Sequence, residues 1–371
     1  MGFHIVKRAN CPLWKKALFY LLAIAVALVL GGVILLAIGV DPITYYTRMF
    51  TMGIIGNRYP HKVYMNYLAR WVPLALTALG LSLAFKMRFW NIGGEGQFIV
   101  GALAATASAI LLEGKLPNAA ILVIMCAAAM VAAGLIGLMV AALKVKFGTN
   151  ETLLTLMLNY ISLSFLSYLL LHKKSWNIFL RPEASRATAK AVPSDALFPS
   201  FSFGGKFQLS LCVILVFVIA VLIYIYLKHT KQGYEINVVG DSPGTARYAG
   251  MKTGKIVLRT VFLSASLIGL AAAFTVGTGT GTSLSESITN SVGWTGIIVA
   301  WLSQLNTWAI MLVSALISLL HQGSTNAALT FKQVSADFAN MLQGFLLFLI
   351  LVADFMIRFK FVRTRKENSN G

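Results

Sequence analysis

A series of apolar stretches, each about as long as a lipid bilayer is thick, is the feature of this sequence that most constrains its fold. A helix needs roughly 20 apolar residues to cross the hydrocarbon core. Stretches of about that length run over 17–40, 67–85, 93–112, 118–143, 151–171, 207–227, 258–280 and 337–357. Only 12% of the 371 residues are charged, whereas a soluble domain has about 25%. The predicted fold class is therefore an all-α polytopic membrane protein.

A further apolar block, 293–322, is too long for one span and too short for two. If the N-terminus is cytoplasmic and this block crosses twice, most of the 31 Lys and Arg residues lie on the inner side, as the positive-inside rule requires. A single crossing would send the basic tail outside. We therefore predict about ten transmembrane helices with N- and C-termini both cytoplasmic. Two short helices, about 293–305 and 308–322, would be buried in the bundle, because neither comfortably crosses lipid alone.

This topology divides the chain into three parts. Residues 1–16 would be a cytoplasmic N-terminal segment, 17–357 the transmembrane domain and 358–371 a basic cytoplasmic tail. Two long polar segments interrupt the transmembrane domain, an extracytoplasmic loop at 172–206 and a cytoplasmic loop at 228–257. After Asp41-Pro42 ends the first span, the residues up to about 66 are interpreted as a loop, whose Tyr45, Tyr46 and Tyr59 suit a membrane interface.

The sequence contains no signature of enzyme chemistry. It has no G-x-x-x-x-G-K-[ST] loop for ATP, so the chain is not predicted to hydrolyse ATP itself. The five His residues are scattered, and Cys11, Cys126 and Cys212 are too far apart to suggest a metal site or a disulfide framework. The formal charge of +19 is interpreted as a topology signal for a protein in membrane lipid rather than as a nucleic-acid surface.

The stretch WNIGGEGQF at 90–98 is the strongest candidate for function. It places Asn91, Glu95 and Gln97 beside three glycines at the start of an apolar span. An ionisable residue in a membrane helix is costly and suggests function. The bland alternative is that the glycines only let helices approach closely. Glu95 itself could be a proton site, or a structural carboxylate held by N–H groups of its own Gly-rich turn or by Arg70.

Two short echoes suggest an internal repeat. IGGEG (92–96) resembles VGWTG (292–296), and LMLNY (156–160) resembles NMLQG (340–344). If they are real rather than chance, the two halves have opposite topologies, an inverted repeat typical of transporters. Amides within spans, including Asn159 and Gln343, suit a neutral solute that bears hydroxyls or a base, and Trp294 could stack on a ring. Each of these residues could instead serve only helix packing.

The segment GDSPGTARYAG at 240–250 predicts a short helix in the cytoplasmic loop. Ser242 can cap it, Pro243 can start it and Gly250 can end it. Two turns would display Tyr248 and Met251 on the cytosolic face. In a membrane protein without a motor of its own, such a helix could dock a soluble partner, although an ordinary surface helix would show the same pattern.

Taken together, the motifs identify a family. They resemble permease subunits of bacterial ABC importers in the branched-chain amino acid, ribose and nucleoside superfamily, closest to the nucleoside and simple-sugar branch. The blocks that carry the resemblance are FWNIGGEGQ (89–97), TLMLNYI (155–161), GDSPGTARYAG (240–250), GWTGI (293–297) and, more weakly, LQG (342–344) with AD (353–354). Trp90, Ser242 and the Gly244-Thr245 pair depart from the family pattern and leave the exact solute open.

The resemblance implies a fold, partners and site residues. It implies about ten helices per subunit in a bacterial plasma (inner) membrane, a second permease subunit as heterodimer partner, cytoplasmic ABC ATPase subunits that bind the ATP, and an extracytoplasmic substrate-binding lipoprotein. The chain itself would need no cofactor. The ATPase-coupling helix would comprise Ser242, Pro243, Ala246, Arg247, Tyr248, Ala249 and Gly250. The substrate pathway would include Asn91, Glu95, Gln97, Asn159, Trp294 and Gln343. The alternatives are a proton-coupled secondary carrier that uses Glu95 and a non-transporting scaffold.

Overall fold

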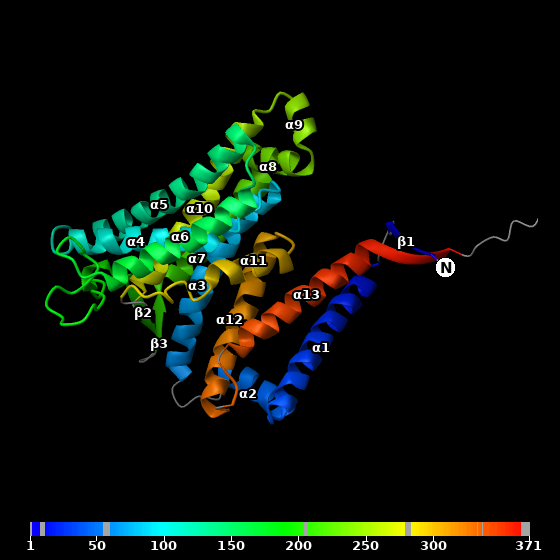
Figure 1. Cartoon of the computed structure of the whole chain (residues 1–371), viewed down its shortest axis with the longest axis horizontal. Coiled ribbons are helices and arrows are strands. Elements are labelled where there is room, and N and C mark those ends of the chain that lie inside the picture. Colours follow the sequence, from blue (N-terminus) through cyan, green and yellow to red (C-terminus); the bar gives the residue numbers. More distant parts are fainter. Residues whose placement is uncertain are drawn as a thin grey trace, which may run out of the picture. The chain divides into compact units, whose positions relative to one another are not determined.

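The computed structural model of this chain describes residues 2–7, 12–54, 60–203, 207–278, 283–331, 333–335 and 337–364. Cys11, Tyr59, the end of the Gly-Thr run at 279–282, the side chain of Asp354 and the tail from 365 onward lie outside the described part. The helices are α1 (Leu13–Ala37), α2 (Pro42–Ile54), α3 (Pro60–Lys86), α4 (Gly94–Leu112), α5 (Asn118–Phe147), α6 (Glu151–Leu171), α7 (Leu211–His229), α8 (Lys231–Asp241), α9 (Pro243–Tyr248), α10 (Thr253–Gly277), α11 (Val292–Leu302), α12 (Thr307–Thr330) and α13 (Phe338–Arg358) (Figure 1).

Nine of the described helices are long and apolar enough to cross a membrane, and α11 is a shorter apolar helix. This confirms the predicted all-α polytopic class. The predicted break within 293–322 is present, between α11 and α12. The expectation that both pieces are short was wrong for α12, which has 24 residues. Its polar last turns stay helical because they pack on α2, where the hydroxyls of Ser324 and Tyr45 lie 2.9 Å apart.

The prediction of a loop after Asp41 was also wrong, because α2 occupies 13 of those residues. Asp41 starts this helix by accepting the backbone N–H of Thr44 at 2.9 Å. Hydrogen bonds from Thr44 hold the pKa of the Asp41 carboxyl below its usual range. Only one face of α2 is apolar enough to be buried, with Tyr45 and Met49 almost fully enclosed. Burial raises the pKa of Tyr46 to about 12. A half-apolar helix of this length gives a weak hydropathy signal.

The chain divides into two compact units. Unit 2 covers Tyr59–Ser318, and unit 1 combines Met1–Arg58 with Leu319–Gly371. In unit 2, α10 packs along α5, α3 and α4 (Figure 1). Small residues allow this close approach: a Cβ at Gly101 would lie 2.8 Å from the Cα of Gly269, and one at Gly269 would collide with the carbonyl of Ala129. Most of α3 is enclosed by its neighbours.

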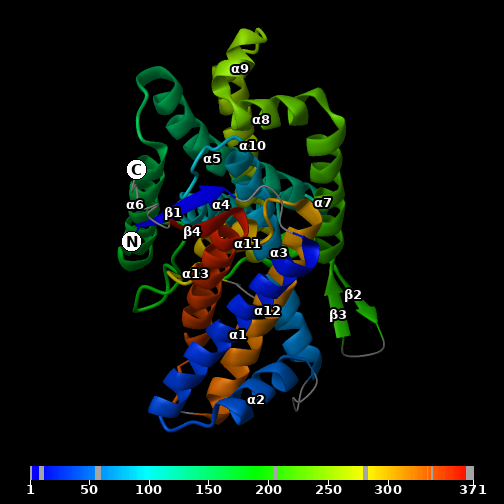
Figure 2. The ribbon, with the colours of Figure 1, turned by 90° about the vertical axis from the view of Figure 1, so that its right-hand side faces the viewer.

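Unit 1 is built from the two ends of the chain. Helices α1 and α13 lie side by side (Figure 2), and Ala27, Leu35 and Leu342 belong to its core. Strand β1 (Gly2–Lys7) pairs antiparallel with β4 (Phe359–Thr364), with Gly2 opposite Thr364. Because the two strands are paired, both terminal segments lie on the same side of the membrane. The distribution of Lys and Arg predicts that this is the cytoplasmic side.

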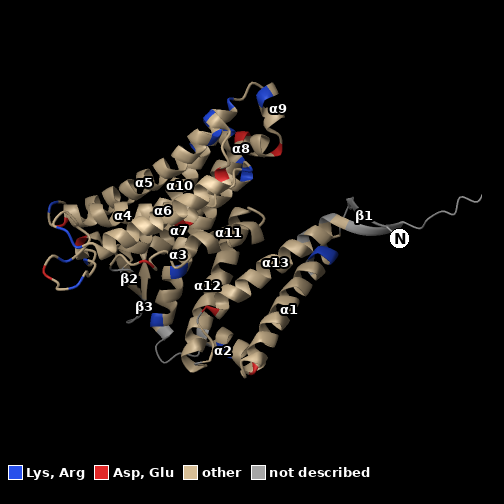
Figure 3. Cartoon of the chain, viewed as in Figure 1, with Lys and Arg blue, Asp and Glu red and all other residues tan. Residues whose placement is uncertain are grey.

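The loop predicted at 172–206 is folded over one end of unit 2. It contains a short 3-10 helix, η1 (Ser194–Ala196), and β2 (Ser200–Phe203). Strand β2 pairs antiparallel with β3 (Phe207–Ser210), so the prediction that a span begins at 207 was wrong, and α7 begins at Leu211. Phe198 donates its N–H to the Gly277 carbonyl at 2.8 Å and packs edge-on against Phe274. Figure 3 shows that most charged residues of unit 2 lie in such loops and near the helix ends, so the middles of the helices carry few charges.

Candidate functional site

Two buried amides fix the turn that leads into α4. Nδ2 of Asn91 donates to Oε1 of Gln97 at 3.1 Å, and Nε2 of Gln97 donates back to Oδ1 of Asn91 at 3.1 Å. The same Oδ1 accepts the backbone N–H of Gly93 at 3.1 Å. Both side chains are almost fully buried. Every polar atom of the pair has a partner, so the pair holds the turn without help from solvent.

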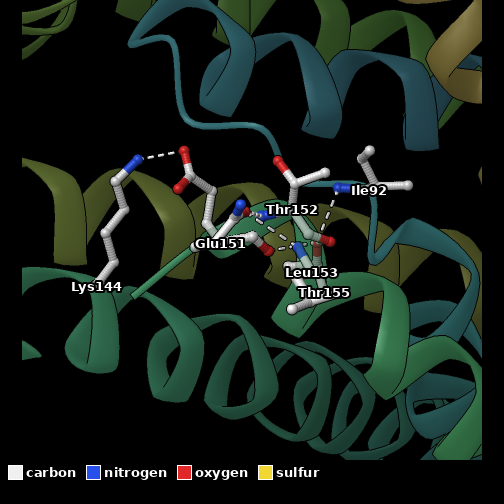
Figure 4. Close-up of polar contacts among 7 residues, drawn as sticks. Ile92, Lys144, Glu151, Thr152, Leu153 and Thr155 are labelled. Carbon is white, nitrogen blue, oxygen red and sulfur yellow. Dashed lines mark hydrogen bonds and ion pairs between the residues drawn. The ribbon is translucent and has the colours of Figure 1, made fainter. Parts of the chain in front are cut away.

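Helix α6 holds the same turn from the other side. Oδ1 of Asn159 accepts the N–H of Gly96 at 2.8 Å, and its Nδ2 donates to the Ile92 carbonyl at 2.9 Å. One helical turn earlier, the Thr155 hydroxyl accepts the N–H of Ile92 at 3.2 Å (Figure 4). A Cβ at Gly96 would lie 2.9 Å from the Leu158 carbonyl, so the close approach requires glycine. The start of α4 is therefore capped by side chains of α6.

The start of α6 is itself well fixed (Figure 4). Asn150 accepts the N–H groups of Thr152 and Leu153 at 3.0 and 3.2 Å, which confirms the predicted helix start. Lys144, in the last turn of α5, forms an ion pair with Glu151 and lies over the Phe89 ring at 4.9 Å. These contacts join the end of α5, the start of α6 and the turn before α4.

Glu95 joins α4 to α11. Its Oε2 accepts the backbone N–H of Gly293, in the first turn of α11, at 2.9 Å, and the Thr289 hydroxyl and the Trp294 N–H also contact the carboxylate. A Cβ at Gly293 would lie 2.6 Å from the Cα of Glu95. The N-terminus of a helix carries partial positive charge and unpaired N–H groups, so it stabilises an anion. The two glycine-rich helix starts that echo each other in sequence thus touch.

The structural interpretation of Glu95 named the wrong partners. The carboxylate is not held by its own turn, whose Gly96 N–H goes to Asn159. Nor does it pair with Arg70, whose guanidinium donates to the Asn290 carbonyl at 3.2 Å. The interacting groups are 198 residues apart in sequence, and no local pattern reveals such a contact.

Aromatic side chains lie at the other end of α11. Trp90 and Trp301 are stacked with ring centroids 5.3 Å apart and an angle of 17° between their planes, and Phe85 packs against both. Trp90 is 45% exposed and Trp294 39% exposed. Among the six predicted pathway residues, Trp294 presents the largest open surface, whereas Asn91, Gln97 and Asn159 are buried within their own contacts.

Gln343 stands apart from the other predicted pathway residues. It belongs to unit 1, on α13, whereas the others belong to unit 2. Its side chain is 2% exposed, and its Nε2 has no hydrogen-bond partner in the part of the chain that the structure describes. A buried amide donor without a partner is uncommon, so this atom is a candidate for a contact that forms with another molecule or in another conformation.

The predicted coupling segment forms two helices, α8 and α9, of which α8 was not foreseen. Figure 2 shows α8 running across the end of α7. Ser242 caps α9 by accepting the Thr245 N–H at 3.2 Å, Pro243 is the first residue of the helix, and Ala246 is its buried residue. Gly250 ends the segment with a φ of +76°. Tyr248 is 96% exposed. The short helix predicted from Ser242, Pro243 and Gly250 is therefore present and displays an aromatic side chain.

A close backbone contact connects α8 to the end of α3. A Cβ at Gly240 would collide with the Lys86 carbonyl, so α8 rests directly on the backbone that leads to Trp90. Arg259 of α10 holds the middle of α8 through an ion pair with Glu235 at 3.1 Å. Sequence reasoning included Gly240 in a motif but had no signal for its partner.

No group of three His, Cys, Asp or Glu side chains is arranged to hold a metal ion among the described residues. The side chains of Cys126 and Cys212 are free thiols. The fold and site together define a class, a membrane transport protein. Nine of its described helices are long enough to cross the membrane, amides and a carboxylate fix the starts of α4 and α11, and α9 is a capped helix with an exposed side chain.

Comparison with known proteins identifies the family. Residues 63–351 match the permease component of branched-chain amino acid transport systems, and the chain belongs to this family. It is 29% identical to the glucose ABC transporter permease protein of Haloferax volcanii, over 95% of this chain and 92% of that protein. It is 27% identical to the guanosine ABC transporter permease protein of Bacillus subtilis, over 94% and 97%. It is also 27% identical to the nucleoside ABC transporter permease protein of Lactococcus lactis, over 84% of each.

These findings confirm the resemblance inferred from the motifs. The chain is a multi-pass protein of a bacterial inner membrane and a transport component rather than an enzyme.

Proposed function

We propose that this chain is the permease subunit of an ATP-driven importer for nucleosides or a related small polar solute such as a simple sugar. The observation that carries the proposal is the match over most of the chain to permeases whose names specify guanosine, nucleosides and glucose. Its partners would be a second permease subunit that forms a heterodimer with it, cytoplasmic ABC ATPase subunits that bind the ATP, and an extracytoplasmic substrate-binding lipoprotein.

The α8–α9 segment would receive the motion of the ATPase. Helix α9 exposes Tyr248 almost completely. Helix α8 would pass its movement to the backbone at the end of α3, because Gly240 contacts the Lys86 carbonyl without an intervening side chain. Ser242, Pro243, Ala246, Ala249 and Gly250 would shape the coupling helix, and Arg247 and Tyr248 would contact the ATPase. Movement of α8 would then reach α3 and the turn before α4.

The predicted pathway residues would divide into two roles. Trp294, with its open indole, would stack on the ring of the solute. Asn91, Glu95, Gln97 and Asn159 would hold the helices that line the pathway, since their polar atoms already have partners within the protein. Gln343, with a donor that lacks a partner, would contact the solute or the partner permease.

Uptake by reconstituted vesicles tests the proposal. The chain is co-reconstituted with candidate ATPase, second-permease and lipoprotein subunits from the same organism, and uptake of radiolabelled guanosine and glucose is measured with and without ATP. We expect uptake of one of them that requires ATP and all the partners. Uptake by the chain alone, driven by a proton gradient, would instead identify a secondary carrier.

The coupling helix can be tested with matched tyrosines. Replacing Tyr248, which is 96% exposed on α9, with Ala should leave the free energy of unfolding within about 0.5 kcal/mol, because an exposed side chain contributes little. It should lower ATP-driven uptake at least about tenfold, which a loss of about 1.4 kcal/mol of docking energy suffices to cause. The control is Tyr234→Ala, since Tyr234 is 62% exposed on α8. Equal uptake by the two variants contradicts the assignment of α9.

A further inference from the structure

Helix α11 lies between two pairs of residues with unusual backbone conformation. Five non-glycine residues in the described part of the chain have a positive φ. Four of them flank α11: Asn290 (+45°) and Ser291 (+57°) before it, and Gln304 (+49°) and Leu305 (+58°) after it. The left-handed conformation is unfavourable for residues with a Cβ, and such strain concentrates where a backbone changes conformation. Both ends of α11 therefore have the character of hinges.

One short segment holds α11 at both ends. Glu95 accepts the Gly293 N–H at the start of α11, and Trp90 stacks on Trp301 near its end. Both contacts come from segment 90–95, which precedes and opens α4. Helix α11 has 11 residues, so at 1.5 Å per residue it is about as long as six extended residues. We call these two contacts the α11 latch.

The latch is anchored on a fixed support. Segment 90–95 is bound to α6 at Ile92, whose carbonyl accepts from Asn159 and whose N–H donates to Thr155. By contrast, the N-cap of α11, Ser291, makes no side-chain capping bond of its own. The first turn of α11 thus depends on a carboxylate from another helix, and its position follows that of the support.

The outward face of α11 is a continuous stripe. Trp294, Ile297, Ile298 and Trp301 are exposed or half-buried, whereas Gly293, Gly296, Val299 and Ala300 are buried. The stripe follows the i, i+3, i+4, i+7 spacing of one helix face. A rotation of α11 would therefore move this whole apolar and aromatic face together, as expected for a helix that lines a transport pathway.

We propose that α11 moves as a rigid unit about the hinge pairs 290–291 and 304–305, and that Glu95 and Trp90 are positioning residues that latch it in the conformation described. The consequence for uptake rests on the proposed function, whereas the latch itself does not. Glu95 then works through a backbone N–H of α11 and not through the solute or a transported proton.

Hydrogen–deuterium exchange of the full chain in lipid nanodiscs tests the latch. Glu95→Ala and Trp90→Ala should each raise exchange of the α11 amides about tenfold, the effect of losing one charge-assisted hydrogen bond or one aromatic stack. Exchange in α5 should not change. Glu95→Gln should raise exchange less than about threefold, because the amide oxygen still accepts the Gly293 N–H. The control is Glu113→Gln, which removes an exposed carboxylate that pairs with Lys190.

Unchanged exchange of α11 in Glu95→Ala overturns the latch, and so does an increase that spreads equally to α5. If Glu95→Ala does not fold, Trp90→Ala and Glu95→Gln decide by the same criteria. In the assembled importer, Glu95→Ala should lose uptake and Glu95→Gln should retain it. Loss of uptake in Glu95→Gln with protected α11 amides overturns the positioning role. If the unmodified importer takes up neither guanosine nor glucose, the proposed function fails while the exchange result still decides the latch.

Discussion

The two glycine-rich helix starts, at α4 and α11, are alike in sequence and differ in how they are held. The start of α4 is fixed by neutral amides, with Asn91 and Gln97 paired inside the turn and Asn159 reaching in from α6. The start of α11 has no capping side chain of its own and relies on Glu95. Helix α6 thus caps α4, and α4 caps α11.

The difference separates a support from an element that can move. Several amide contacts that share one turn must break together to release α4, so the cost of releasing it is high. The start of α11 instead relies on one carboxylate from another helix, which accepts the Gly293 N–H and also contacts Thr289 and Trp294, and left-handed residues flank the helix at both ends. The same GxxG spacing therefore serves rigidity in one place and mobility in the other.

The largest expected difference between the two helix starts appears when one methyl group is added to a glycine of each. Gly293→Ala places a Cβ against the backbone nitrogen and Cα of Glu95, which neither can avoid, and should lower the free energy of unfolding by about 3 kcal/mol. Gly94→Ala meets its nearest atoms at 3.5 Å, an ordinary contact, and should cost less than about 1 kcal/mol. Thermal unfolding in detergent, followed by intrinsic fluorescence, measures both. Equal melting temperatures of the two variants would contradict the close contact between Gly293 and Glu95.

A smaller effect is expected from removing the cap that α6 provides. Asn159→Ala leaves the Gly96 N–H and the Ile92 carbonyl buried without partners and should cost about 2–3 kcal/mol. The matched control is Asn306→Ala, which removes an exposed cap at the start of α12 and should cost about 1 kcal/mol. The same unfolding assay compares them. An Asn159 variant no less stable than the Asn306 variant would show that α4 does not depend on α6.

The smallest effect concerns the hinge before α11. Ser291→Gly removes the left-handed strain of a residue with φ +57° and should stabilise the described conformation by about 0.5 kcal/mol, because the relieved strain exceeds the added entropy of the unfolded chain. Exchange of the α11 amides should slow about twofold. Faster exchange in this variant would mean that Ser291 holds α11 in a way that its backbone conformation does not explain.

The sequence predicted the parts of this molecule whose signal is local. Apolar length located the spans, and Ser242, Pro243 and Gly250 located α9, because capping residues act within a few positions. Helix α2 was missed because only Tyr45, Met49 and their neighbours on one face are apolar. The short length expected for 308–322 was wrong because polar residues near Ser324 meet α2 rather than end the helix.

The candidate site shows the same limit. Asn159 and Glu95 were recognised as unusual residues in a membrane chain, but their partners lie 63 and 198 residues away. Nothing in the pattern of residues around Glu95 specifies the Gly293 N–H rather than Arg70. Contacts of this kind are set by packing of the whole bundle, so they become visible only in three dimensions.

The composition of unit 1 has a consequence for biosynthesis. Its core joins α1 to α13, which follows α1 by about 300 residues in the sequence, and its strands pair Gly2 with Thr364. Chains are made and inserted from the N-terminus onward, so α1 must wait in the bilayer without its main partner while all of unit 2 is inserted. Synthesis that stops before α13 would thus leave unit 2 complete and α1 without its main partner.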